Sequence, residues 1–105
     1  SLAAEALAVN PADVDTMCIA AWARAMQGRS AEALALIGKA MDAAPRNPYP
    51  QYYAALIRTR TGDFELANAA AQRAIELGYP QSLMAAEPHL AALRARTELA
   101  DAAGR

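Results

Sequence analysis

Residues suited to covalent or metal chemistry are scarce in this sequence, which has one cysteine, Cys18, and one histidine, His89. A single cysteine excludes an internal disulfide framework. Cys18 falls near the amino end of a predicted helix, and neither residue has a Ser-His-Asp pattern or metal-ligand spacing beside it. No glycine-rich phosphate loop is present. We therefore expect a non-enzyme without a catalytic, metal or cofactor site.

Long apolar runs and runs of like charge are also missing. Arg, Glu or Gln interrupts the apolar stretches before they reach the length of a membrane-spanning helix. Lys and Arg number 10 against 11 Asp and Glu, which gives a net charge of −1. This balance, without a basic patch, argues against a surface for DNA or RNA. The expected partners therefore exclude nucleic acid and the membrane interior.

The start of the chain lacks both an initiator methionine and the pattern of a secretory signal. Ser1 already lies within a helical pattern, which predicts that the chain is a piece of a longer protein. The lone cysteine leans weakly towards a reducing compartment. The compartment thus stays unassigned from sequence, with the cytoplasm slightly favoured.

Alanine, by contrast, is abundant, with 30 residues among 105, whereas there is one Trp and one Phe. Alanine has the highest helix propensity and lets helix backbones approach closely. The composition therefore predicts closely packed helices without a large aromatic core.

Small residues recur with a period of 34 residues. The recurring pairs are Ala20 and Ala54, Arg24 and Arg58, Gly28 and Gly62, Ala33 and Ala67, and Ala40 and Ala74. A period of this length is typical of stacked helix pairs, none of which can bury its apolar face alone. We predict one domain over 1–105, composed of the second helix of a truncated repeat (1–11), two repeats (12–47 and 48–79) and degenerate capping helices (80–105).

Glycines and polar caps mark the predicted helix ends. The helices are expected over about 13–27, 30–44, 48–62, 63–77, 83–86 and from 88 onward. Gly28 and Gly62 are predicted left-handed stops, and Ser30 and Asp63 predicted N-caps. Gly38, inside the second of these helices, indicates a position of close helix packing.

The repeat resembles the tetratricopeptide repeat, a family of 34-residue helix-turn-helix units with a sparse pattern of Trp, Leu-Gly, Tyr, Ala, Phe and Pro. The matches are Ala33 and Ala67, Ala40 and Ala74, Pro45, and the turn glycines Gly28 and Gly62. The departures are Met17 and Gln51 for Trp, Ala20-Ala21 and Ala54-Ala55 for Leu-Gly, Arg24 and Arg58 for Tyr, and Ile37 and Ala71 for Phe. The resemblance covers about 1–79, and 74–94 looks like the end of many bacterial arrays. It implies a right-handed α-solenoid of antiparallel helix pairs from a bacterial protein.

The resemblance further implies a concave surface, lined by the first helix of each repeat, where family members bind peptides or protein segments. Helical spacing places eight candidate partner-binding residues on this face, and we call them the predicted stripe: Asp15, Cys18, Trp22, Met26, Tyr49, Tyr52, Leu56 and Arg60. Trp and Tyr supply rigid contact area with a polar tip, as in binding hot spots. The predicted stripe is therefore apolar and aromatic.

Several residues of the predicted stripe have a second interpretation. Trp22, Met26 and Leu56 could instead pack between repeats or under the terminal cap. Groove exposure is favoured for Trp22 together with Tyr52, and burial is at least as favoured for Met26 and Leu56. Arg60 could pair with an acidic side chain of a ligand, but a solvated charge near the negative end of a helix dipole is favoured.

Two classes of function remain in view. The first is a non-catalytic module that binds a peptide or protein segment of unidentified sequence in the groove. The second is a structural module that stacks on further repeats, or on itself through an exposed N-terminal face with Leu2, Leu7 and Val9. A regulatory segment of a larger bacterial signalling protein is the first class in a wider context.

Overall fold

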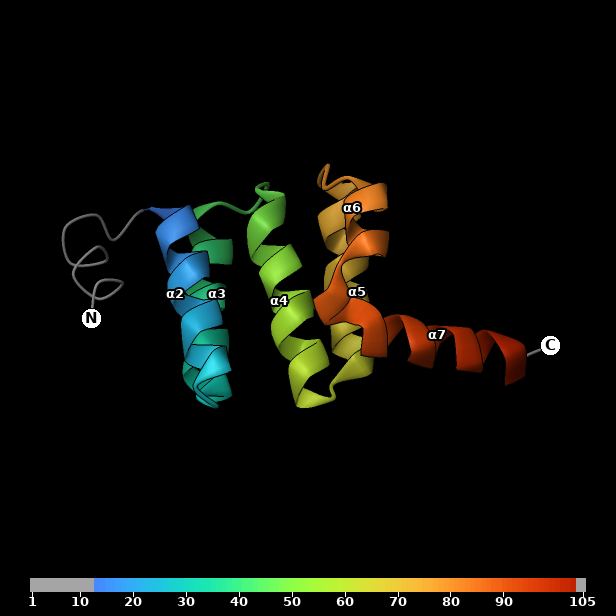
Figure 1. Cartoon of the computed structure of the whole chain (residues 1–105). Helices are drawn as coiled ribbons and strands as arrows, with labels where there is room; N and C mark the ends of the chain where they lie inside the picture. The colour runs from blue at the N-terminus through green and yellow to red at the C-terminus, as the bar shows by residue number, and fades with distance from the viewer. Residues whose placement is uncertain (1–12, 104–105) are drawn as a thin grey trace.

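The computed structural model describes residues 13–103 and the side chains of residues 13–97, and this part of the chain is all-α, without a strand (Figure 1). Its elements are α2 (Val14–Met26), α3 (Ser30–Ala43), α4 (Pro48–Thr61), α5 (Phe64–Glu76), α6 (Gln81–Ala86), the 3-10 helix η1 (Pro88–Leu90) and α7 (Ala91–Ala103). The all-α prediction is confirmed for these residues. The expected helix over 1–11, with Leu2, Leu7 and Val9, lies outside them.

Local sequence signals end and begin several of these helices. Gly28 and Gly62 have φ angles of 79° and 84°. Residues with a Cβ avoid this left-handed region, so glycine ends the helix there, as predicted. Asp13 is the N-cap of α2, and its carboxylate accepts hydrogen bonds from the backbone N–H and the hydroxyl of Thr16. Asn47 caps α4, where its side-chain oxygen accepts from the N–H of residue 49.

The N-caps of α3 and α5 differ from the prediction. Arg29, and not Ser30, is the N-cap of α3, and its guanidinium forms a two-pronged ion pair with Glu32. Asp63 is the N-cap residue of α5 but makes no capping hydrogen bond. Its carboxylate lies 3.0 Å from the Thr61 hydroxyl instead. Both helices therefore begin without a side-chain cap: the Arg29 guanidinium has no acceptor for the N–H groups of α3, and the Asp63 carboxylate bonds to Thr61.

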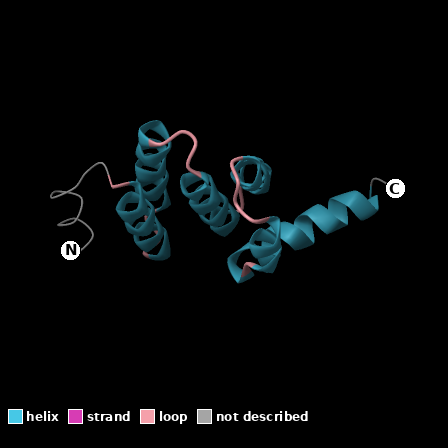
Figure 2. Ribbon diagram, turned by 90° about the horizontal axis from the view of Figure 1, so that it is seen from above, coloured by secondary structure: helices cyan, strands magenta, loops and turns pink. Residues whose placement is uncertain are grey.

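The helices α2 to α5 form two hairpins. α2 packs on α3, α4 packs on α5, and α4 also contacts both α2 and α3. In Figure 1, α2 and α4 stand in front of α3 and α5, so that first and second helices form two layers. Figure 2 shows the same helices from above, side by side. The core lies between these layers.

Alanines supply most of the positions in this core. They make up eleven of the twenty buried apolar side chains among the described residues. Residues one period apart share the same environment: Ala33 and Ala67 are both fully buried, as are Ala40 and Ala74. Small side chains at these positions let the helix backbones lie close together, so that the 34-residue period is also a period of packing.

The prediction that Gly38 is a site of close packing is wrong. A Cβ built on this glycine would meet no atom within 4 Å. Gly38 borders a shallow hollow between α3, α4 and α5 whose volume is about 340 Å³. Its lack of a side chain therefore leaves space open and does not serve a helix crossing.

The C-terminal cap consists of α6, η1 and α7. Glu87 and Pro88 interrupt the helical path after α6, because a residue that precedes proline is driven out of the helical conformation. η1 packs on α4, and the first part of α7 packs on α5. Leu90 and Leu93 join the buried cluster. The remainder of α7 leads away from the hairpins (Figure 1). Within residues 13–103, each helix is too short or too polar to cross a bilayer.

Candidate functional site

Two members of the predicted stripe are buried and offer no surface to a ligand. Cys18 is 0% exposed and Leu56 is 3% exposed, and both belong to the core cluster. The direct contact between α2 and α4 is the reason, since it leaves no room for solvent between the facing sides of these helices. Burial of Leu56 is one of the two alternatives that the sequence left open. Burial of Cys18 corrects the prediction that its side chain faces the groove.

The other members lie at or near the surface. Met26 and Tyr49 are each 49% exposed, so that the burial held at least as favoured for Met26 is not found. Asp15 and Arg60 are exposed, and Trp22 and Tyr52 are half-buried and pack against the core. The structure therefore places Asp15 and Tyr49 together near the amino ends of α2 and α4, where they line one hollow, and Met26 and Arg60 near the opposite ends of the same helices.

The chain's own cap partly covers the aromatic centre of the predicted stripe. The Tyr52 hydroxyl donates a hydrogen bond of 2.7 Å to the Glu87 carboxylate. The Trp22 indole meets the His89 ring edge-on, with ring centroids 5.0 Å apart and planes at 70°. The exposure expected for Trp22 and Tyr52 is thus only partial, and the alternative of packing under the cap describes their contacts.

All four tyrosines of the chain meet in one group, which we call the tyrosine cluster: Tyr49, Tyr52, Tyr53 and Tyr79. The Tyr52 and Tyr79 rings are stacked, with centroids 4.5 Å apart. Tyr49 meets Tyr79 edge-on at 6.1 Å, and Tyr53 meets Tyr52 edge-on at 5.3 Å. Stacked and edge-on pairs are the favoured aromatic geometries, and they hold these rings in fixed orientations.

The bond between Tyr52 and Glu87 sets the ionisation of both groups. It is the main cause that lowers the pKa of the Glu87 carboxyl below its ordinary 4.5. Burial first, and then the bond to Glu87, raises the pKa of the Tyr52 hydroxyl above its ordinary value. Both shifts favour the same state, a neutral phenol that donates to a charged carboxylate, and this state holds the cap on α4.

A small hollow of about 290 Å³ opens at the Asp15 end of the predicted stripe. Its lining is Asp15, Cys18, Ile19, Tyr49 and Tyr53. Ile19 is 60% exposed and half of Tyr49 is exposed, whereas the buried Cys18 forms the floor. Burial, with Asp15 as a second cause, raises the pKa of the Cys18 thiol to about 12. The thiol is therefore neutral at physiological pH and is no nucleophile.

Arg60 lies at the opposite end of the stripe and has a partner in the chain itself. Its Nε donates to the carbonyl oxygen of Ala25, in the last turn of α2, at 3.3 Å. A cation near the carboxyl end of a helix interacts favourably with the helix dipole. This contact agrees with the favoured interpretation of Arg60 as a charge near a helix end, and it leaves other N–H groups of the guanidinium for solvent.

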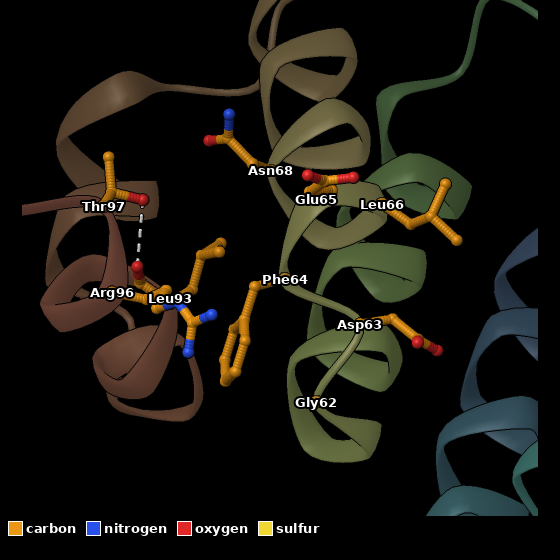
Figure 3. Close-up of a pocket in the computed structure, with 9 residues that line it drawn as sticks. All are labelled: Gly62, Asp63, Phe64, Glu65, Leu66, Asn68, Leu93, Arg96 and Thr97. Carbon is orange, nitrogen blue, oxygen red and sulfur yellow. Dashed lines mark hydrogen bonds between the residues drawn. The ribbon is translucent and has the colours of Figure 1, made fainter. Parts of the chain in front are cut away.

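A second, larger opening lies between α5 and α7, and we call it the α5–α7 groove (Figure 3). Its volume is about 580 Å³, and its lining is Gly62, Asp63, Phe64, Glu65, Leu66, Asn68, Leu93, Arg96 and Thr97. The Arg96 guanidinium carbon lies 5.4 Å from the centroid of the Phe64 ring and closes one end. The lining also includes the acids Asp63 and Glu65, so that the charge of the groove is mixed.

Sequence analysis missed four residues that the structure brings to the site: Tyr53, Tyr79, Glu87 and His89. Tyr79 could have been singled out from the sequence, because it lies one 34-residue period after Pro45, where the pattern predicts a second proline. No sequence pattern indicates Glu87 and His89, because their position depends on how the chain turns at Pro88. Among residues 13–97, no group of three or more His, Cys, Asp and Glu side chains is placed to hold a metal ion.

Comparison with models of protein families, with curated proteins and with solved structures finds no match to this chain. Residues 13–103 form an all-α fold with an aromatic face on α2 and α4 and a cap folded against this face. Its function has to be argued from this geometry.

Proposed function

We propose that the chain is part of a right-handed α-solenoid of tetratricopeptide type. The equal environments of residues one period apart support this: Ala33 and Ala67 are fully buried, and Gly28 and Gly62 both end a first helix in the left-handed region. The stacking of the hairpin α2–α3 beside α4–α5 supports it further. On this proposal α6, η1 and α7 are a degenerate third unit that serves as the cap.

We propose that the function is non-catalytic binding of a peptide or protein segment on the face of α2 and α4. One observation carries this proposal. Of the five exposed large apolar side chains among the described residues, three belong to these two helices: Ile19, Met26 and Tyr49. Exposed large apolar side chains that share one pair of helices are typical of an interaction site.

The cap limits what such a segment can contact. Because η1 packs on α4 and meets Trp22, the centre of the predicted stripe is available only at its edges. The free contact area therefore lies at the Asp15–Tyr49 end and at the Met26–Arg60 end. A short segment with weak affinity fits a surface of this size better than a long helix does.

A selection from a random peptide library on the immobilised protein tests the proposal. We expect enriched peptides whose binding, measured in solution, is abolished by the triple variant Ile19→Ala, Met26→Ala, Tyr49→Ala. Ile19→Ala and Met26→Ala should each change the free energy of unfolding by no more than about 0.5 kcal/mol, because these side chains are exposed. Tyr49→Ala also removes the edge contact with Tyr79 and should cost about 1 kcal/mol. Circular dichroism at 222 nm checks that the helices are retained.

The matched control is the double variant Leu66→Ala, Leu83→Ala, which removes exposed leucines from α5 and α6. The control should bind the selected peptides as the unaltered protein does. Absence of enrichment over a blank surface, or equal losses in the control and the triple variant, would contradict peptide binding on α2 and α4.

A second candidate, assembly with further repeats or with another copy, is favoured by the cap end of the molecule. An apolar hollow of about 270 Å³ continues the α5–α7 groove towards Ile75, Met84 and Leu90. Sedimentation over a wide concentration range tests it. We expect a rise in mass with concentration that Ala85→Arg, inside the hollow, prevents and Ala95→Arg, exposed elsewhere on α7, does not. A constant monomer mass would leave this candidate without support.

A further inference from the structure

The hollow at the Asp15 end combines three kinds of surface that suit one kind of ligand group. Ile19 is apolar and exposed, Tyr49 and Tyr53 are aromatic, and Asp15 brings a carboxylate. Tyr79 holds the Tyr49 ring edge-on at 6.1 Å, so that this wall is part of the tyrosine cluster. The hollow thus offers aromatic walls and one negative charge beside the apolar side chain of Ile19.

Asp15 lies in the first turn of α2, where the helix dipole favours an acid, but no cationic side chain of the lining balances its charge. No Lys or Arg is among the residues that line the hollow. Asp15 takes part in none of the ion pairs of the described residues, whose cations are Arg29, Arg58 and Arg73. The other acid of the first turn, Asp13, is committed to Thr16 through two hydrogen bonds. Asp15 is therefore the charge that a ligand would meet.

Asp15 acts on two ionisable groups that line the hollow with it, Cys18 and Tyr53. Burial, and then Asp15, raises the pKa of the Cys18 thiol to about 12. Burial first, with Cys18, Tyr79 and Asp15 as further causes, raises the pKa of the Tyr53 hydroxyl. Burial is the main cause of both shifts, and Asp15 is a further cause. The negative charge of Asp15 would repel the carboxylate of a ligand as well, whereas it would attract a cation.

We propose that this hollow takes the lysine side chain of the bound polypeptide segment, with the ammonium group at Asp15 and Tyr49 and the methylene stem on Ile19. The inference rests on the proposed function, because the side chain belongs to the segment bound on α2 and α4.

A lysine side chain matches each surface in turn. Its methylenes are apolar and cover apolar surface while the charged head remains near water. Its ammonium group is attracted by a carboxylate and by the face of a tyrosine ring. An aspartate or glutamate side chain would place like charge beside Asp15, and a purely apolar side chain would leave the carboxylate without a partner.

Three small probes with the same alkyl stem test the proposal by NMR: n-butylammonium, which is the lysine side chain itself, n-butanol and butyrate. We expect saturable shifts of the backbone N–H signals of Asp15, Cys18 and Tyr49 with n-butylammonium, weaker binding of n-butanol and no saturable shift with butyrate. Asp15→Asn should weaken the binding of n-butylammonium about fivefold, through the loss of one exposed charge partner. Tyr49→Ala should weaken the binding of n-butylammonium about threefold, because the face of the tyrosine ring is lost.

The matched control for the charge is Asp42→Asn, the same change at an exposed aspartate of α3. It should leave n-butylammonium binding unchanged. Equal affinities for the three probes, equal binding by Asp15→Asn and the unaltered protein, or no saturable shift with n-butylammonium would each overturn the proposal.

Failure here is distinguishable from failure of the proposed function. If the peptide library yields segments that depend on Ile19, Met26 and Tyr49 but n-butylammonium does not bind, the binding function stands and the lysine inference is wrong. If n-butylammonium binds and Asp15→Asn weakens it while the library yields nothing, the hollow accepts the cation and the peptide-binding function is contradicted.

Discussion

The Thr59 hydroxyl of α4 is a buried oxygen without a hydrogen-bond partner among the described residues. Its residue is 6% exposed. A buried hydroxyl without a partner loses its bonds to water and gains none. Thr59→Val, which replaces this hydroxyl by a methyl group, should therefore raise the free energy of unfolding by about 1 kcal/mol. Urea unfolding with an unchanged slope measures the gain.

The control for Thr59 is Thr61→Val on the same helix. The exposed Thr61 hydroxyl lies 3.0 Å from both the Arg58 carbonyl and the Asp63 carboxylate, so its removal should bring no gain. A loss of stability in Thr59→Val would mean that the buried hydroxyl has a partner in solution, and it would refute the prediction.

The Tyr52 hydroxyl provides a second prediction at the residue scale. Tyr52→Phe removes its hydrogen bond to the half-buried Glu87 carboxylate and should lower the free energy of unfolding by about 1–2 kcal/mol at neutral pH. Tyr49→Phe keeps the aromatic ring at a half-exposed position and should change the free energy of unfolding by less than about 0.5 kcal/mol. Thermal or urea unfolding of both variants gives the comparison. Equal effects would show that the bond to Glu87 does not stabilise the cap.

The contribution of this bond should depend on pH in a defined direction. The pKa of Glu87 is lower in the folded protein than its ordinary 4.5, so the unfolded chain binds more protons as the pH falls below about 4.5. The stabilisation is then present above that pH and is lost as the pH falls through the folded pKa. The raised pKa of Tyr52 acts at the other end, because the unfolded chain releases its proton near pH 10 and the folded protein does not. The difference between Tyr52→Phe and the unaltered protein should therefore shrink on both sides of neutrality.

Glycines with opposite roles provide the prediction at the scale of the element. Gly62 ends α4 with a φ of 84°, where an added Cβ is strained, so Gly62→Ala should destabilise the protein by about 1–2 kcal/mol. Gly38 lies inside α3 with open space around its Cβ position, so Gly38→Ala should stabilise the protein by about 0.5–1 kcal/mol through helix propensity. Midpoints of thermal unfolding give both signs. A lower midpoint for Gly38→Ala would mean that Gly38 does occupy a close-packed position and would contradict this prediction.

Leu90 provides the prediction at the scale of the whole molecule, because it joins the cap to the core of the hairpins. Leu90 is 1% exposed in the buried cluster, so Leu90→Ala should lower the free energy of unfolding by about 2–5 kcal/mol. Leu83→Ala, on α6 and 56% exposed, should cost less than about 0.5 kcal/mol. The fluorescence of Trp22, which contacts His89 of the cap, and circular dichroism should report one common transition. Similar costs for the two leucines would mean that the cap is not part of the cooperative fold.

At the same scale, the candidate site was only partly predictable. Asp15, Tyr49 and Arg60 are on or near the surface, as their place on the predicted stripe indicates, whereas Met26 is exposed although burial was at least as favoured for it. The spacing could not show that Cys18 and Leu56 are closed off between α2 and α4, because burial depends on the neighbouring helix and not on the periodicity of one helix. Nor could it show that a residue 35 positions away bonds to Tyr52.

The sequence by itself determined the helices, most of their ends and the period of their small residues. Left-handed glycines, the Asn47 cap and alanine-rich helices act through the local backbone, within a turn or two of each residue, so their effect is readable from sequence. Only the tertiary structure decided which side chains remain open to a partner. The turn at Glu87 and Pro88 directs Glu87 and His89 towards Tyr52 and Trp22, and this long-range contact depends on the summed packing of separate helices. Function is decided at that level, because a ligand meets only the surface that the cap leaves free.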